Sequence, residues 1–139
     1  MEAKQYLRQA HRLNELIASE QEELNELRRL AETVSSPVIS DMPKNPSSSL
    51  EAPYVKYVLK MAELEKKIEQ KMEHYLSIKD EIRAVINEVT NNEERLLLRY
   101  RYINFLEWED ICDRMNVSER TVHRIHSSAL QKVIVPKHL

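Results

Sequence analysis

The chain has 139 residues, 32% of them charged and 42% hydrophobic, and its formal net charge is −2. It contains no glycine, which excludes Rossmann-type and Walker-type phosphate sites because their motifs require glycines at defined positions. The single cysteine, Cys112, excludes an internal disulfide and a cysteine-rich zinc site, and no apolar run approaches the ~18 residues of a membrane span. We therefore expect a cytoplasmic, mainly helical protein that does not enter a membrane.

Charge is distributed unevenly along the chain. Residues 1–90 carry 13 basic and 16 acidic side chains, whereas the segment from Arg114 to the C-terminus carries five basic side chains and one acidic side chain, Glu119. An excess of positive charge on one segment favours an anionic partner there. The C-terminal segment is therefore the predicted binding region.

Two long helices are predicted, at residues 1–34 and 54–90. Their apolar residues follow alternating spacings of three and four, which is typical of coiled-coil packing. Residues 35–53 hold four of the five prolines together with many serines, and we predict that they form a linker. Residues 1–90 are thus expected to form an antiparallel coiled-coil hairpin.

Each apolar series is interrupted by one charged residue, Glu20 in the first helix and Lys71 in the second. If the helices run antiparallel, these two side chains lie opposite each other, and such a pair adds little net stability but can fix the register. The alternative is that each side chain bends out of the seam into solvent. Further apolar residues beside the seam indicate an additional packing surface, for a second copy of the chain or for another protein.

The remaining residues, 91–139, are predicted to form a separate domain of short helices. Asn104 is expected to end the first of them in a left-handed conformation. A second helix follows, after which Asn116 makes a turn, Val117 enters the core and Ser118 caps the last helix.

The last helix has two chemically different sides. Its apolar stripe, at spacings of three and four, consists of Val122, Ile125, Ala129 and Val133. The opposite side carries Glu119, Arg120, His123, Arg124 and Ser127. A short helix, a turn of about three residues and a second helix with a polar outward half form the helix-turn-helix pattern, which places the second helix in the DNA major groove.

The stretch "ERLLLRYRYINFLEWEDICDRMNVSERTVHRIHSSALQKV", residues 94–133, resembles region 4 of bacterial sigma factors, which recognises the −35 promoter element. Together with the long helical front end, it is also similar to small transcriptional regulators of phages and integrated elements of Gram-positive bacteria. The resemblance implies that four residues face the bases: Glu119, Arg120, His123 and Arg124. It implies contacts to the DNA backbone from Ser118, Thr121, Ser127, Lys132, Arg99 and Arg101, although Arg99 and Arg101 also fit a solvated helix face.

The chain departs from the sigma-factor pattern at two of these positions. Sigma factors usually carry a basic residue where Glu119 stands and an acidic residue where Arg120 stands, so we expect a different target sequence. Glu119 can accept a hydrogen bond from cytosine N4, while Arg120 and Arg124 can donate to guanine O6 and N7.

Metal binding and catalysis are not expected. His123 and His126 are three residues apart, but no third ligand is close in the sequence, so we predict neither a metal nor a cofactor. We expect His126 to border the core and Trp108 to cover it. Adjacent carboxylates such as Glu109 and Asp110 point to different sides of a helix, and no nucleophile and base are paired, so an enzyme is not predicted.

The predicted protein is therefore all-α, with a coiled-coil hairpin followed by a sigma-region-4-like helix-turn-helix domain. We expect a sequence-specific DNA-binding transcriptional regulator, with double-stranded DNA, RNA polymerase and a second copy of the chain as partners. Two alternatives stay open. One is a coiled-coil adaptor that binds RNA polymerase or another protein, and the other is a DNA-packaging subunit similar to small terminases, although in those the DNA-binding domain usually comes first.

Overall fold

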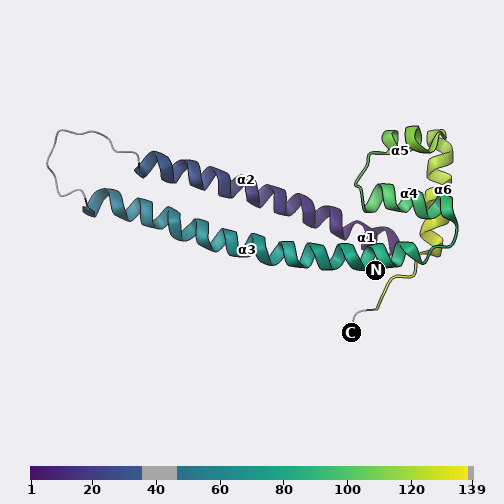
Figure 1. Ribbon diagram of the computed structural model, residues 1–139, viewed down its shortest axis with the longest axis horizontal. Helices are drawn as coiled ribbons and strands as arrows, with labels where there is room; N and C mark the ends of the chain where they lie inside the picture. The colour runs from purple at the N-terminus through teal and green to yellow at the C-terminus, as the bar shows by residue number, and fades with distance from the viewer. Residues whose placement is uncertain (36–46, 138–139) are drawn as a thin grey trace. The chain divides into compact units, whose positions relative to one another are not determined.

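The structure is a computed structural model that describes residues 1–35 and 47–137. All regular elements of these residues are α-helices, which confirms the predicted all-α class. In chain order they are α1 (Ala3–Leu7), α2 (Gln9–Ser35), α3 (Ser47–Asn87), α4 (Asn92–Tyr102), α5 (Trp108–Met115) and α6 (Glu119–Lys132), as Figure 1 shows.

The predicted linker, residues 35–53, is only partly covered by the structure. Residues 36–46 lie outside the described residues, while α3 begins at Ser47 and includes Pro53. Helix α3 is therefore longer at its start than the predicted second helix. Serine and proline are weak helix formers, which explains why the sequence favoured a linker up to Pro53.

The helices contribute to two compact units. Unit 1 combines Met1–Asn14 with the described residues from His74 onward, and unit 2 is Glu15–Glu73. This division differs from the predicted boundary at residue 90, because both ends of the predicted hairpin pack with the C-terminal helices in unit 1.

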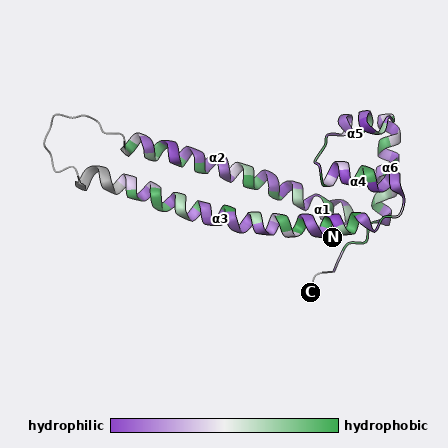
Figure 2. Ribbon diagram, viewed as in Figure 1, coloured by the Kyte–Doolittle hydropathy of each residue, from purple (hydrophilic) through white to green (hydrophobic). Residues whose placement is uncertain are grey.

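Unit 2 consists of two antiparallel helical segments. The first residues of its α2 segment pair with the last residues of its α3 segment, since Lys71 forms an ion pair with Glu20 and Arg28 lies 3.3 Å from Glu65. The predicted contact between Glu20 and Lys71 is thereby confirmed. Apolar side chains buried in this unit are Ile17, Leu24, Ala31, Leu64 and Ile68. Figure 2 shows hydrophobic and hydrophilic residues interspersed along both helices.

Replacement of Lys71 by methionine is expected to destabilise the protein by about 1 to 3 kcal/mol, because Glu20 is largely buried and loses its partner. The second oxygen of Glu20, Oε2, already has no hydrogen-bond partner among the described residues. The double variant Glu20→Leu/Lys71→Met should therefore be as stable as the unaltered chain or more stable. The free energy of unfolding of each variant is measured by urea denaturation. A double variant less stable than both Lys71→Met and Glu20→Leu would contradict the expectation.

Arg28→Met is the matched control for this prediction. Its ion pair with Glu65 is half exposed on both sides, and exposed pairs typically contribute about 0 to 1 kcal/mol.

Unit 1 has two clusters of buried side chains. The first joins the N-terminal segment to three later helices and contains Tyr6, Leu7, Ala10, Ile82, Ile86, Val89, Leu98, Tyr102, Ile103 and Ala129. The second lies between α4, α5 and α6 and contains Leu97, Ile111, Val122 and Ile125. Helix α4 contributes to both, because the neighbours Leu97 and Leu98 point into different clusters.

The turn between α5 and α6 forms as predicted. Asn116 adopts the left-handed conformation, with φ 55° and ψ 49°, and Val117 packs against the second cluster. The Ser118 hydroxyl accepts a hydrogen bond from the Thr121 backbone N–H at 3.2 Å, which caps the start of α6.

The predicted left-handed residue after α4 was wrong by one position. Phe105 has the positive φ, 57°, and Asn104 does not. The Phe105 ring packs against His11, with ring centroids 4.9 Å apart, and lies 5.0 Å from the Lys79 ammonium. These tertiary contacts offset the steric cost of a positive φ at a residue with a large side chain.

Candidate nucleic-acid interface

Helix α6 separates its buried and exposed residues as its sequence pattern indicates. Val122, Ile125 and Ala129 are buried in the two clusters of unit 1, and Val133 packs against the first of them. The residues predicted to face DNA bases are all exposed, namely Glu119, Arg120, His123 and Arg124. The N-terminal half of the helix therefore presents a charged surface to solvent.

The exposed side chains of α6 differ in whether they interact with other side chains of the protein. His123 Nε2 lies 3.8 Å from Glu119 Oε1, one helical turn away, and becomes a charged partner when it is protonated. Arg120 and Arg124 form no ion pair or hydrogen bond within the described part of the chain. Arg124 lines a shallow hollow of about 160 Å³ together with Asn91 and Glu94. Both guanidinium groups are thus available to an external acceptor.

Trp108 organises one edge of this surface. Its ring lies 4.9 Å from the His123 ring, 4.7 Å from the His126 ring and 4.5 Å from the Arg101 guanidinium. It is partly buried and packs against the second cluster, as expected for a residue that covers the core. Its contact with His123 was missed from the sequence, because no local spacing relates a residue at the start of α5 to one in α6.

His126 is buried rather than at the border of the core, with 6% of its surface exposed. Its Nε2 shares a hydrogen bond of 2.7 Å with the Tyr102 hydroxyl. Burial, together with the nearby charges of Lys4, His123 and Arg101, lowers the pKa of His126 from 6.5 to about 4. Burial also raises the pKa of Tyr102 to about 12. Both side chains are therefore neutral at pH 7.

Two of the residues predicted to contact the DNA backbone already have partners within the protein. Lys132 Nζ lies 2.7 Å from Glu94 Oε1, which also accepts a hydrogen bond from the Ser128 hydroxyl at 3.1 Å. Glu94 is only 7% exposed, so Lys132 compensates a buried carboxylate. Arg101 donates to the Leu106 carbonyl at 2.9 Å and thereby holds the loop between α4 and α5. These two cations are less available to phosphate than the sequence indicated.

Of the other four residues predicted to contact the DNA backbone, two are exposed and two are partly buried. Ser118 donates to Thr121 Oγ1 at 2.9 Å, so both hydroxyls take part in the start of α6. Ser127 is exposed, and Arg99 is partly buried on α4. Contacts of all these residues with DNA stay predictions.

The described residues contain no group of three or more His, Cys, Asp or Glu side chains that could hold a metal ion. Within the same residues, no helix has the length and apolar character needed to cross a membrane.

The model of the family described as "Protein of unknown function (DUF1492)" matches residues 48–133, from the start of α3 to the end of α6. No curated protein and no solved structure matches the chain. Because the matched residues make up more than half of the sequence, the chain belongs to the DUF1492 family.

Proposed function

We propose that this protein is a sequence-specific DNA-binding transcriptional regulator of the phage or mobile-element type. In this proposal α5, the turn at Asn116 and α6 form a sigma-region-4-like helix-turn-helix, and α6 enters the major groove. One observation carries the proposal: the N-terminal half of α6 exposes two unpaired arginines while its opposite side is buried in the core.

Base readout follows from the chemistry of the exposed residues. A guanidinium donates two parallel hydrogen bonds to guanine O6 and N7, and a carboxylate accepts from cytosine N4. Arg120 and Arg124 have no competing acceptor in the described chain, so they supply the guanine contacts. Glu119 supplies the cytosine contact, and His123, placed by Trp108, lies beside it.

Affinity for DNA requires more than this helix. Few basic groups in one small domain give weak binding at physiological salt. We propose that residues 15–73 act as a coiled-coil hairpin that brings a second copy of the chain or RNA polymerase to the same DNA. The protein would then act in the cytoplasm by binding alone, without catalysis.

The proposal is tested by selecting binding sites from random duplex DNA with the purified protein. We expect an enriched sequence that contains guanines. Arg120→Ala and Arg124→Ala should each weaken binding to that sequence by about 1 to 3 kcal/mol, and each should relax the preference at one base position. Binding is measured by fluorescence anisotropy at fixed salt.

Arg29→Ala serves as the matched control, because Arg29 is exposed on α2 and far in sequence from α6. It should bind the selected duplex as the unaltered chain does. Absence of any enriched sequence, with the helices intact by circular dichroism, would exclude the proposed function.

A second candidate is a protein-binding adaptor. Large apolar side chains are exposed on the described part of α3, namely Tyr54, Val55, Val58, Leu59, Met72 and Leu76. Exposed apolar residues at this density favour a protein interface. A chain that binds no DNA but still self-associates or binds RNA polymerase would support the adaptor.

A further inference from the structure

The N-terminal segment carries a row of three basic side chains. Lys4, Arg8 and Arg12 are four residues apart. The backbone stays helical through the break between α1 and α2, since Arg8 N–H donates to the Lys4 carbonyl and Arg12 N–H to the Arg8 carbonyl, both at 3.1 Å. Residues at this spacing lie on the same side of a helix. The three charges therefore form one row, about 12 Å long at 1.5 Å per residue.

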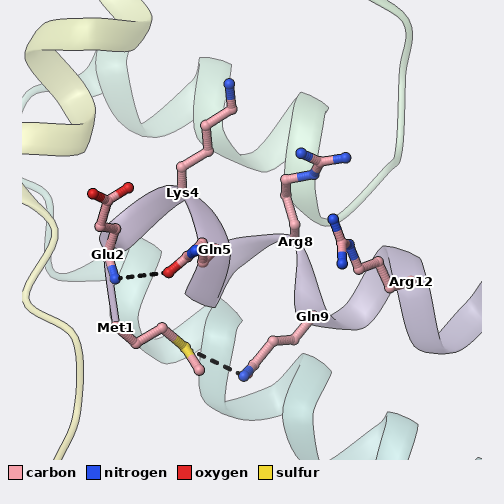
Figure 3. A pocket seen from close by; sticks show the side chains of 7 residues that line it. All are labelled: Met1, Glu2, Lys4, Gln5, Arg8, Gln9 and Arg12. Carbon is pink, nitrogen blue, oxygen red and sulfur yellow. Dashed lines mark hydrogen bonds between the residues drawn. The ribbon is translucent and has the colours of Figure 1, made fainter.

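The row is open to solvent. All three side chains are exposed, and none forms an ion pair or a hydrogen bond within residues 1–35 and 47–137. In Figure 3 they project to one side of the helix, whereas Met1 and Gln9 lie on the other side and share a hydrogen bond of 3.4 Å. A hollow of about 460 Å³ runs along this segment, with Glu2 as its acidic lining residue.

The row is fixed to the same core as α6. Leu7 and Ala10 are fully buried in one cluster with Ala129 of α6. The positive charge of Lys4 acts on His126 of α6 and lowers its pKa, and the charge of Arg8 acts on Tyr102 of α4 in the same direction. The basic row thus belongs to the compact unit that carries the proposed recognition helix.

Charge changes sign directly after the row. Residues 1–14 contain three basic and one acidic side chain, whereas residues 15–35 contain two basic and six acidic side chains. Positive charge is therefore concentrated on the part of the N-terminal helices that packs with α6, and a polyanion would be repelled from the rest of α2.

We infer that Lys4, Arg8 and Arg12 form a second DNA-backbone surface, which binds phosphates beside the site read by α6. This inference rests on the DNA-binding function proposed above. One strand of a duplex presents a phosphate about every 3.4 Å along its axis, so a 12 Å row spans about three phosphates. Since Lys132 and Arg101 are engaged within the protein, this row supplies the phosphate contacts that the sequence assigned to them.

The test compares two triple variants of equal charge change. Lys4→Gln/Arg8→Gln/Arg12→Gln removes the row. Lys60→Gln/Lys66→Gln/Lys67→Gln removes three exposed charges from α3 in unit 2 and leaves unaltered the exposed apolar side chains that are proposed to hold a partner. Each is titrated with the selected duplex and with an unrelated duplex of equal length at several salt concentrations. We expect the first variant to bind both duplexes roughly 10- to 100-fold more weakly. The slope of log affinity against log salt should fall by about 2 to 3, while the control keeps both values.

The outcomes separate this inference from the proposed function. If the unaltered chain binds no DNA, both fail. If it binds a selected sequence and the first variant keeps the affinity and the salt slope, the basic row is not a DNA surface, although the proposed function stands. Binding of an acidic protein by the row, with DNA binding unchanged, would equally overturn the inference.

Two further variants distinguish a loss of phosphate contacts from a loss of the folded structure. Arg8→Lys/Arg12→Lys keeps the charge and should retain the salt slope of the unaltered chain. The single variant Arg12→Gln should lower that slope by about 1. An unchanged slope in Arg12→Gln, with the Trp108 fluorescence transition intact, would contradict a phosphate contact at that position.

Discussion

Replacement of Leu7 by alanine is expected to lower the free energy of unfolding of unit 1 by about 2 to 5 kcal/mol. Leu7 is fully buried in the cluster that joins the N-terminal segment to α3, α4 and α6. Alanine would remove buried methyl groups and leave a cavity that these packed helices can close only in part. The effect should therefore reach residues more than 90 positions away in the sequence.

Urea denaturation followed by tryptophan fluorescence measures this effect within unit 1, since Trp108 is the one tryptophan of the chain and packs against the second cluster. Leu76→Ala is the matched control, because Leu76 is 57% exposed on α3 and its truncation leaves no buried cavity. We expect that variant to change stability by less than about 1 kcal/mol.

The same experiment separates two views of domain organisation. If residues 91–139 folded independently of the N-terminus, Leu7→Ala would leave the Trp108 transition where it is in the unaltered chain. A shifted transition would mean that the helices around α6 depend on residues 1–14 for their stability.

Acidification is expected to destabilise unit 1 through His126. The unfolded chain binds a proton on this histidine near pH 6.5, whereas the folded chain binds it only near pH 4, because the site is buried and close to other positive charges. The unfolded state therefore holds more protons between these values, and stability falls as the pH decreases from about 6.5 to 4. The loss is on the order of 3 kcal/mol at the lower end.

The pH dependence is measured as the urea midpoint at several pH values for the unaltered chain and for His126→Gln. Glutamine can keep a hydrogen bond to the Tyr102 hydroxyl but does not titrate, so the fall between pH 6.5 and 4 should become much smaller. Tyr102 does not contribute in this range, since its pKa is about 12. His74→Gln is the control, because His74 is exposed on α3. An equal fall in His126→Gln would show that another group causes it.

Features that depend on residues close in the sequence were predictable. The two sides of α6 follow from the spacing of Val122, Ile125 and Ala129, since residues three and four apart share one side of a helix. The cap at Ser118 and the left-handed turn at Asn116 depend on the local chemistry of those two residues. The ion pair of Glu20 with Lys71 was predictable on the assumption that the two helices run antiparallel, because the spacing of their apolar residues then indicates which positions lie opposite each other.

Features that depend on contacts between distant segments were not predictable in this way. Phe105 rather than Asn104 takes the left-handed conformation, because its ring packs against His11 from the other end of the chain. Lys132 pairs with Glu94 because Glu94, on α4, is largely buried and its carboxylate requires a nearby cation. No spacing of residues in the sequence predicts either contact.

By itself, the sequence determined that this protein is all-α, where α6 begins and which of its residues face solvent, because helix periodicity and capping act within a few residues. Only the tertiary structure decided that residues 1–14 complete the core around α6 and that Lys132 and Arg101 are occupied within the protein. It also decided that Lys4, Arg8 and Arg12 share a compact unit with α6. The physical reason is that burial and charge pairing are set by which helices meet in space, and no local pattern specifies that meeting.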